Sequence, residues 1–171
     1  FGKKPTQEMN ELVKKIGIVL QNPEDQLIGP TVFDDIAFTP LNLGWDEKVV
    51  IDRVNELLEK FDIQDLSKKV PHYLSDGQKK KVAIAGAVAH KPELLVLDEP
   101  LALLDSESEN KIIKFLKELN EKENVTLIFS TNRFDVMKKL ATKVYLLKNG
   151  RIIFEGKPSK LRKTSLASVY R

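Results

Sequence analysis

The most constraining feature of the chain is an apolar run that ends in two adjacent carboxylates. Leu94–Leu97 are four consecutive aliphatic residues, and Asp98 and Glu99 follow them directly. A short run of this kind is typical of a strand buried on both faces, and open α/β sheets bind ligands at the carboxyl ends of their strands. One carboxylate at that position can hold Mg²⁺, while the other can orient or deprotonate a water. The alternative is a buried strand followed by an acidic loop.

Strands and helices alternate along the chain, which indicates an α/β domain with a mainly parallel sheet. Apolar runs predict strands at Ile16–Leu20, Leu94–Leu97, Val125–Phe129 and Val144–Leu147. Apolar spacing and small residues predict helices over Asp46–Phe61, Gly77–His90, the segment around Ile112–Leu119, and Arg133–Leu140. Asp46 and Ser106 are the capping candidates of two of these helices, and Asn149-Gly150 predicts a hairpin.

The stretch 31–91 is mostly helical and interrupts this alternation, so we expect it to form a separate helical lobe. The remaining α/β core would comprise residues 1–30 and 92–157, followed by a short tail over 158–171. Phe33, Ile36 and Phe38 fall at the start of the lobe. They are expected in the core of a short helix, and a resemblance to a known family, carried by the motifs described next, implies a partly exposed coupling surface as the alternative.

Composition narrows the function classes. The absence of cysteine excludes disulfides and thiolate metal sites, and a net charge of +3 is too small to indicate nucleic acid or an anionic membrane. The longest apolar runs are far shorter than the roughly 20 residues of a membrane helix. Lysine runs such as Lys79–Lys81 are expected to lie on solvated helix faces. His72 and His90 are isolated, so we expect polar surface or loop residues rather than metal ligands.

A second motif, Leu74–Gln78 (LSDGQ), precedes the acidic strand. A hydroxyl and a glycine that open a helix offer unpaired backbone N–H groups and the positive end of the helix dipole, which together favour phosphate. The alternative is an ordinary helix start capped by Ser75 or Asp76.

With both motifs, the chain resembles the ATP-binding subunits of ABC transporters. It is most similar to the energy-coupling-factor type, which imports cobalt, nickel or vitamins. Leu74–Gln78 is similar to the LSGGQ signature and Leu94–Glu99 to the Walker B strand with its catalytic glutamate. Gln21 resembles the Q-loop glutamine, Asp105 the D-loop aspartate and Ser130–Asn132 the switch-histidine loop. The stretches that favour the energy-coupling-factor subgroup are 21–44 and 70–86.

The resemblance implies an ABC cassette, a P-loop NTPase-like fold, and a role for each matching residue. Asp98 would hold Mg²⁺ through water, and Glu99 would act as general base on the attacking water. Gln21 would contact the Mg²⁺ and the water, and Asn132 would occupy the position of the switch histidine. The residues implied to act across a dimer interface, on a nucleotide held by the opposite subunit, are Ser75, Gly77, Gln78 and Asp105.

The resemblance also implies the cofactors and partners. The ligands would be ATP and Mg²⁺, and the partner would be a second ABC ATPase subunit in a homodimer or heterodimer. A transmembrane coupling subunit and a substrate-binding membrane subunit would complete the importer, with no nucleic acid involved. The chain would then lie peripherally on the cytoplasmic face of the cell membrane.

Three departures from the family pattern qualify these roles. The chain contains no G-x-x-x-x-G-K-[ST] motif, so we expect a cassette that begins after the P-loop, lacks the P-loop strand and is inactive alone. Asn132 stands in place of the histidine, and Asp76 in place of the first signature glycine. A degenerate, non-catalytic nucleotide-responsive module is therefore the alternative. A third reading, a soluble ABC protein acting on DNA or ribosomes, is disfavoured because Thr31–Gly44 resembles a transporter-coupling segment.

Overall fold

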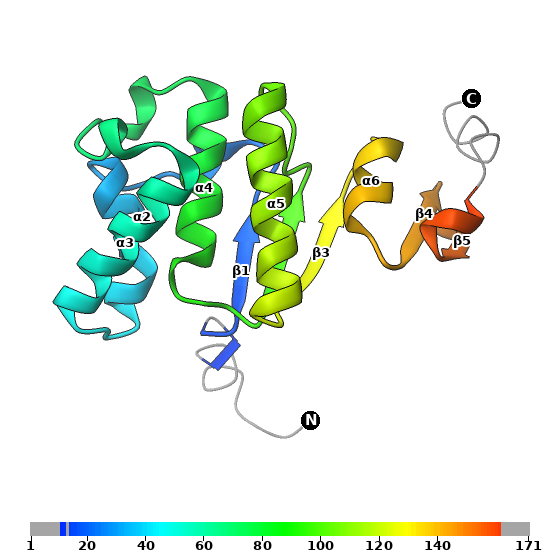
Figure 1. The fold of residues 1–171 in the computed structure, drawn as a ribbon, viewed down its shortest axis with the longest axis horizontal. Coiled ribbons are helices and arrows are strands. Elements are labelled where there is room, and N and C mark those ends of the chain that lie inside the picture. The colour runs from blue at the N-terminus through cyan, green and yellow to red at the C-terminus, as the bar shows by residue number, and fades with distance from the viewer. Residues whose placement is uncertain (1–10, 13, 162–171) are drawn as a thin grey trace. The chain divides into compact units, whose positions relative to one another are not determined.

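The computed structural model describes residues 11–12 and 14–161, which form two compact units. The first unit ends at Ser130 and the second begins at Thr131. The elements of the first unit are β1 (Ile16–Val19), α2 (Val32–Asn42), α3 (Glu47–Phe61), α4 (Asp76–Ala89), β2 (Leu94–Asp98), α5 (Ser106–Lys122) and β3 (Thr126–Ser130) (Figure 1). Those of the second are α6 (Phe134–Leu140), β4 (Val144–Lys148) and β5 (Arg151–Gly156). Short 3₁₀ turns lie at Pro23–Asp25, Gln64–Leu66, Pro71–Tyr73 and Pro158–Lys160.

The sheet of the first unit is parallel and has the strand order β1-β2-β3. Val19 of β1 is opposite Leu97, and Asp98 of β2 is opposite Ser130. The predicted parallel sheet is therefore confirmed for these three strands. Because all three run in the same direction, the residues after β1, at the end of β2 and at the end of β3 meet at one edge of the sheet.

The described helices of the first unit cover one face of this sheet. Val19 and Leu97 are each 1% exposed, and this face lies against the helices, with α4 contacting β1 and α5 contacting β3. On the opposite face Ile18 and Ile128 are 53% and 55% exposed. The prediction that β2 is buried on both faces is therefore wrong, because the described helices of this unit pack on one side only and leave Val96 half-buried.

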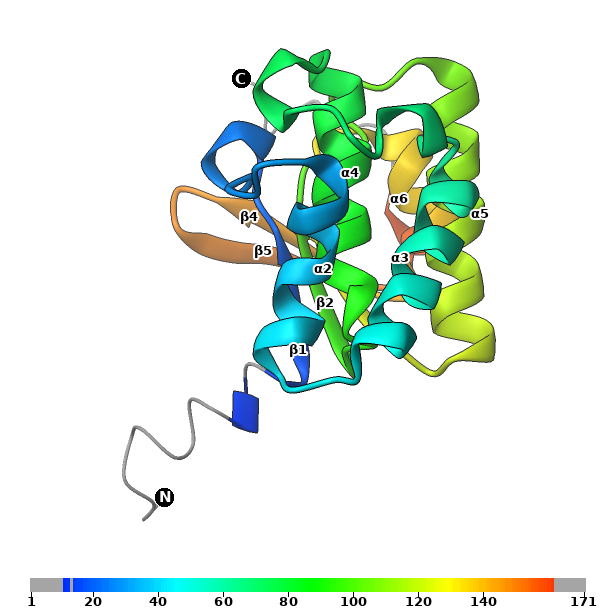
Figure 2. The same cartoon turned by 90° about the vertical axis from the view of Figure 1, so that its left-hand side faces the viewer.

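Helix α4 is the central helix of the first unit, in contact with α2, α3 and β1 (Figures 1 and 2). Its small residues allow the close packing that the sequence predicts. A Cβ atom at Gly17 of β1 would lie 2.3 Å from the carbonyl oxygen of Ala87, so only glycine fits where this strand passes α4.

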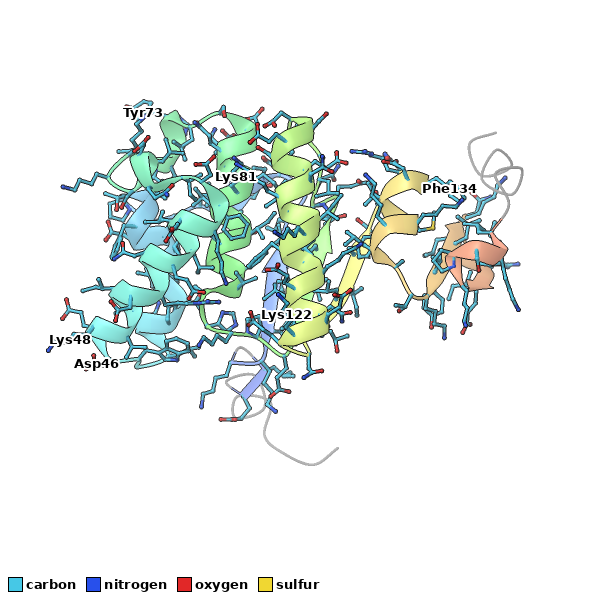
Figure 3. All side chains as sticks on the ribbon, in the orientation of Figure 1. Asp46, Lys48, Tyr73, Lys81, Lys122 and Phe134 are labelled. Atoms are coloured by element: carbon cyan, nitrogen blue, oxygen red, sulfur yellow. The ribbon has the colours of Figure 1, made fainter. Side chains whose placement is uncertain are left out.

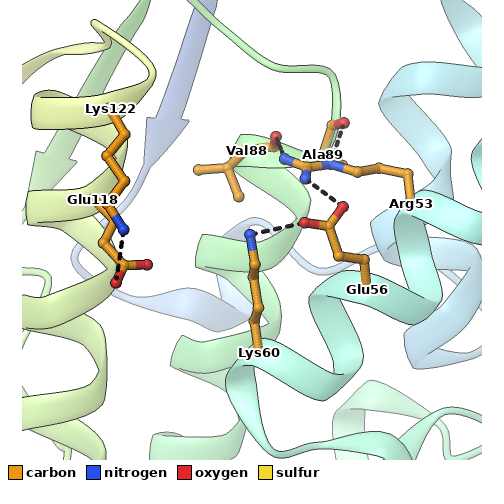
Figure 4. A network of polar contacts seen from close by, with 7 residues as sticks. All are labelled: Arg53, Glu56, Lys60, Val88, Ala89, Glu118 and Lys122. Carbon is orange, nitrogen blue, oxygen red and sulfur yellow. Dashed lines mark hydrogen bonds and ion pairs between the residues drawn. The ribbon is translucent and has the colours of Figure 1, made fainter.

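The last turn of α4 is held by a buried arginine of α3. Arg53 is 6% exposed, and its Nε and Nη2 donate to the carbonyl oxygens of Ala89 and Val88 at 3.2 and 3.0 Å (Figure 4). Its remaining nitrogen pairs with Glu56 at 2.9 Å, and Lys60 pairs with the other carboxylate oxygen. The carbonyl of Val88 also accepts the backbone N–H of Lys91 at 3.1 Å, so Arg53 adds a second donor there, bonds the Ala89 carbonyl, and places a cation at the negative end of the dipole.

The helix starts confirm one predicted cap and correct another. Asp46 accepts the N–H of Lys48 at 2.9 Å and caps α3, as predicted (Figure 3). Ser106 does not cap α5, because it is the first helical residue and the cap is Asp105. A carboxylate one residue earlier, on extended backbone, reaches two N–H groups and so takes that role.

The second unit contains α6 and the antiparallel pair β4–β5, and a small core of Met137, Val144 and Leu161. The predicted hairpin is confirmed, since Asn149 and Gly150 join the strands with φ angles of 51° and 73°. The limits of the predicted helical lobe, 31–91, stay a prediction. Residues 1–10 of the predicted core and 162–171 of the predicted tail lie outside the described residues. No described helix is long and apolar enough to cross a membrane.

Candidate functional site

The end of β2, where two carboxylates follow the apolar run, is held by a serine from the neighbouring strand. Ser130 lies opposite Asp98, and its hydroxyl donates a hydrogen bond to a carboxylate oxygen of that residue. The same hydroxyl accepts the backbone N–H of Glu99 at 3.0 Å. One side chain of β3 therefore fixes the end of β2, and sequence reasoning had placed Ser130 only in the loop of the switch residue.

Glu99 adopts a backbone conformation that few residues with a side chain adopt. Its φ is 44°, in the left-handed region, which costs an L residue roughly 1–2 kcal/mol. Strained backbone of this kind concentrates at functional positions. Five other described residues with side chains, such as Asp62 and Leu103, also have a positive φ, and the functional interpretation of Asp98-Glu99 stays a prediction.

Gln21 follows β1 at the same edge of the sheet. It is exposed, and its backbone is held from α4, because Nζ of Lys80 donates to the carbonyl oxygens of Gln21 and Leu20 at 2.7 and 3.0 Å. The structure thus brings Gln21, Asp98, Glu99 and Ser130 to one edge, as the order of the parallel strands requires.

The lysine run of α4 contradicts the sequence prediction of a solvated face. Lys80 is fully buried and Lys79 is 5% exposed. Burial lowers the pKa of the Lys80 ammonium, and the negative charges of Asp98 and Glu99 oppose that shift. The signal that could have revealed this is spacing, because Lys80 stands one helical turn before the buried Ile84 and hence on the same face of α4.

The start of α4 is a capping box built from the predicted phosphate motif. The Ser75 hydroxyl accepts the N–H of Gln78 at 3.3 Å, and the Gln78 side chain accepts the N–H of Ser75 at 3.0 Å. The cap is therefore Ser75 and not Asp76, and its hydroxyl proton can still donate to an anion. A Cβ at Gly77 would lie 3.0 Å from the carbonyl oxygen of Leu103, so this glycine lets the helix start approach the segment before Asp105.

Asp105 is the N-cap of α5. Its carboxylate accepts the hydroxyl of Ser108 at 2.6 Å and the backbone N–H groups of Ser108 and Glu107 at 2.9 and 3.0 Å. The Ser108 hydroxyl, followed by the backbone N–H groups, lowers the pKa of Asp105 to about 2. The D-loop aspartate implied by the resemblance thus has a structural role in this chain, and its role across a dimer stays a prediction.

We expect Asp105→Ala to destabilise the chain in a pH-dependent way. The pKa of Asp105 is about 2 in the folded chain, whereas an unfolded aspartate has a pKa of roughly 3.9. The cap therefore contributes its full stabilisation above a pH of about 3.9. Its contribution is lost as the pH falls from about 4 toward 2. Urea midpoints of both proteins should differ at neutral pH and converge in acid. Asp105→Asn, a neutral cap, is the control, and a gap independent of pH would contradict the prediction.

The site fits a hard cation bound together with other ligands, not a cation held by protein alone. Among residues 11–12 and 14–161 no group of three or more His, Cys, Asp or Glu side chains could hold a metal ion. Asp98 offers an exposed carboxylate with one hydroxyl partner. Mg²⁺ suits such a position, because it keeps several waters and is bound through one or two carboxylates plus substrate phosphates.

An apolar cavity of about 490 Å³ lies beside β1, α2 and α4. His90 lines it and is 6% exposed, so the prediction of a surface or loop residue is wrong for this histidine, while His72 is exposed as predicted. Burial lowers the pKa of His90, and neither ring nitrogen has a hydrogen-bond partner in the described part of the chain. Two of the residues expected either in a helix core or on an exposed surface also lie in this region. Ile36 is a core residue, whereas Phe38 lines the cavity and is 48% exposed.

Asn132 lies in the second unit, as an exposed residue between β3 and α6. Its proximity to the carboxylates of the first unit therefore stays a prediction, as do the roles of all the residues named from the resemblance.

Comparisons with known proteins identify the family to which the chain belongs. The sequence profile described as ABC transporter matches residues 1–102. The energy-coupling factor transporter ATP-binding protein EcfA of Methanoculleus marisnigri is 45% identical over 150 residues, or 88% of this chain and 54% of that protein. The protein of the same name from Carboxydothermus hydrogenoformans is 44% identical over 167 residues, or 97% and 62% of the two chains. The chain thus spans little more than half the length of the curated relatives it matches.

Solved structures show the same fold. CbiO1 from Clostridium perfringens, part of the ABC transporter complex cbiONQ, superposes with a TM-score of 0.77 at 36% identity, over 90% of this chain and 61% of that one. The dimeric ATP-binding cassette MJ0796, in a post-hydrolysis state with ADP and Pi, gives 0.82 at 27% identity, over 91% and 68%. The predicted ABC cassette fold is therefore confirmed. The family profile and these structures together establish that the chain belongs to the ABC transporter ATP-binding family and is homologous to the energy-coupling-factor ATPases.

Proposed function

We propose that the chain is part of an ATP-hydrolysing subunit that powers an energy-coupling-factor-type ABC importer of a metal ion or vitamin. The observation that carries this proposal is the edge of the sheet where Ser130 holds Asp98 and Glu99 next to Gln21. The named relatives support it, because energy-coupling factor transporter ATP-binding proteins are 44–45% identical to most of the chain.

The reaction would be phosphoryl transfer from ATP to water. Glu99 would accept the proton of the attacking water, and Gln21 would orient that water. Asp98 would hold Mg²⁺ through water, and Gln21 would contact it. The contribution of this cation, when bound, is to neutralise charge on the transferring phosphoryl group.

The residues at the start of α4 and α5 would act across a dimer. Ser75, Gly77 and Gln78 would bind the nucleotide of the opposite ATPase subunit, and Asp105 would act across the same interface. The dimer would bind a transmembrane coupling subunit and a substrate-binding membrane subunit on the cytoplasmic face of the membrane. The relatives give precedent for both contacts, since MJ0796 is dimeric and CbiO1 is part of a transporter complex.

The phosphate-binding loop would be supplied by polypeptide outside these 171 residues, since their sequence contains no P-loop motif. We therefore expect the chain alone to bind ATP weakly. The test is steady-state ATP hydrolysis by the full-length protein assembled with its membrane subunits. Turnover that exceeds that of its Glu99→Gln variant supports the proposal, and turnover equal to that of the variant contradicts it.

A second candidate function is a nucleotide-responsive subunit without catalysis. Two substitutions favour it. Asp76 places a carboxylate at the phosphate-binding end of α4, and Asn132 cannot carry the positive charge available to a histidine.

Asn132→His separates the two candidates. If the site is catalytic, the imidazole should stabilise the transferring phosphoryl group and raise ATP turnover about tenfold, within the range of preorganised groups of this kind. The measurement is the steady-state ATPase rate of the full-length protein with its membrane subunits. An unchanged or lower rate would favour the non-catalytic function. Asn132→Ala is the control, because removing the amide without adding an imidazole should not raise the ATP turnover.

A further inference from the structure

A buried lysine connects helix α4 to the backbone of Gln21. Lys80 is fully buried on α4, where a charged group is costly unless it is hydrogen-bonded. Its ammonium group donates to the carbonyl oxygens of Gln21 at 2.7 Å and Leu20 at 3.0 Å. Both carbonyls lie just beyond β1, which ends at Val19, and the buried charge is used to hold the backbone at this point.

Two further contacts tie the same loop to the same helix. Lys79, which precedes Lys80, forms an ion pair with Glu24. The Gln26 side chain donates to the carbonyl oxygens of Ile18 and Ala83 at 3.0 and 3.4 Å and accepts the N–H of Leu20 at 3.0 Å. The loop 20–26 is therefore fastened to α4 from both of its ends and from its middle.

We propose that Lys80 is a positioning residue, which fixes the backbone of Gln21 to α4 so that this glutamine and the Ser75–Gln78 segment move as one body. Lys80 lies about one turn from the Ser75 cap, within a continuous helix. A displacement of the start of α4 would therefore be transmitted directly to the Gln21 carbonyl. The expected effect on ATP turnover rests on the proposed ATPase function. The attachment of the Gln21 backbone to α4 by Lys80 does not depend on that function.

This arrangement would couple two surfaces with different partners. Ser75 would face the nucleotide of the opposite subunit, whereas Gln21 would face the water and the nucleotide of its own site. Binding on one surface would then reposition a group on the other, and the two hydrogen bonds of Lys80 are the contacts that hold Gln21 itself. Loss of Lys80 should lower the turnover number more than the affinity for ATP, because Lys80 acts through Gln21 and makes no contact with nucleotide in this scheme.

Hydrogen exchange in the full-length protein tests the fastening without any need for ATP hydrolysis. Lys80→Met should raise the exchange rate of amides 20–26 about tenfold, since the loop would open locally without unfolding the domain. Lys80→Arg retains the charge and the donors and should restore most of the protection. Lys81→Met is the matched control, because Lys81 follows on α4 but has no hydrogen bond to this loop in the described residues. Exchange of 20–26 within about twofold of the unmodified protein would overturn the proposal.

Steady-state kinetics test the consequence. Lys80→Met should lower kcat for ATP about tenfold with little change in KM, and Lys80→Arg should recover part of the loss. Faster exchange with an unchanged kcat would overturn the positioning role. If the unmodified protein itself does not hydrolyse ATP, the proposed function fails, while the exchange result still decides whether Lys80 fastens Gln21 to α4.

Discussion

Replacing Glu99 with glutamine in the full-length protein is expected to lower ATP turnover about a hundredfold or more, the range in which removal of a general base falls. The amide has nearly the shape of the carboxylate but cannot accept the proton of the attacking water. Its backbone N–H should still donate to Ser130, so the end of β2 should keep its conformation. ATP-dependent association of two subunits should therefore persist and even be prolonged, because the bound nucleotide is no longer hydrolysed.

The measurements are the steady-state ATPase rate and the ATP-dependent dimer fraction by analytical ultracentrifugation. Glu93→Gln is a matched control, since it removes a carboxylate from the exposed residue just before β2. Turnover within a few-fold of the unmodified protein would remove Glu99 from the mechanism. Loss of turnover together with loss of dimerisation would indicate a structural defect instead.

Arg53→Met is expected to be the most destabilising of the variants considered, with a loss of about 3 kcal/mol in the free energy of unfolding. Arg53 is buried, and methionine can fill much of its volume but cannot donate to the carbonyls of Val88 and Ala89. The carbonyl oxygen of Ala89 would then lose its hydrogen bond from Arg53, whereas that of Val88 would keep the backbone N–H of Lys91 at 3.1 Å. Urea unfolding monitored by circular dichroism would measure the change.

The control for this variant is Glu56→Gln, which weakens the ion pair but leaves both carbonyls bonded to Arg53. Glu56 is 46% exposed, so its charge contributes little, and the expected loss is below about 1 kcal/mol. Equal losses for the two variants would show that the ion pair, and not the end of α4, carries the stability.

Local patterns of the sequence predicted most of the elements. Alternation of apolar runs and amphipathic spacing located β1, β2 and β3 to within a residue or two, and Asn149-Gly150 located the hairpin of the second unit. These predictions succeeded because periodicity and turn chemistry act over a few neighbouring residues. The strand pattern also placed Asp98 and Glu99 at the carboxyl end of a parallel strand, whereas Gln21 was assigned to this site only from the family resemblance.

The errors share a different origin, in contacts between distant segments. Burial of Lys80 depends on carbonyls that lie 59 and 60 positions away in the sequence, which no local pattern contains. The half-exposed face of β2 depends on where the helices pack. The cap of α5 was misassigned by one residue because Asp105 and Ser106 are both good caps, and only the backbone conformation decides between them. The bridge from Ser130 to the carboxylate of Asp98 and the backbone N–H of Glu99 required the strand register.

At position 99, folding and chemistry select different amino acids. Glycine would adopt a φ of 44° without steric cost, and asparagine with little, whereas β-branched residues would be strongly disfavoured. A mutant library screened only for solubility or heat resistance should therefore accumulate glycine and asparagine here and discard the glutamate. A thermostable descendant obtained by such a screen would be a better-folded protein that has lost the group on which the proposed hydrolysis depends.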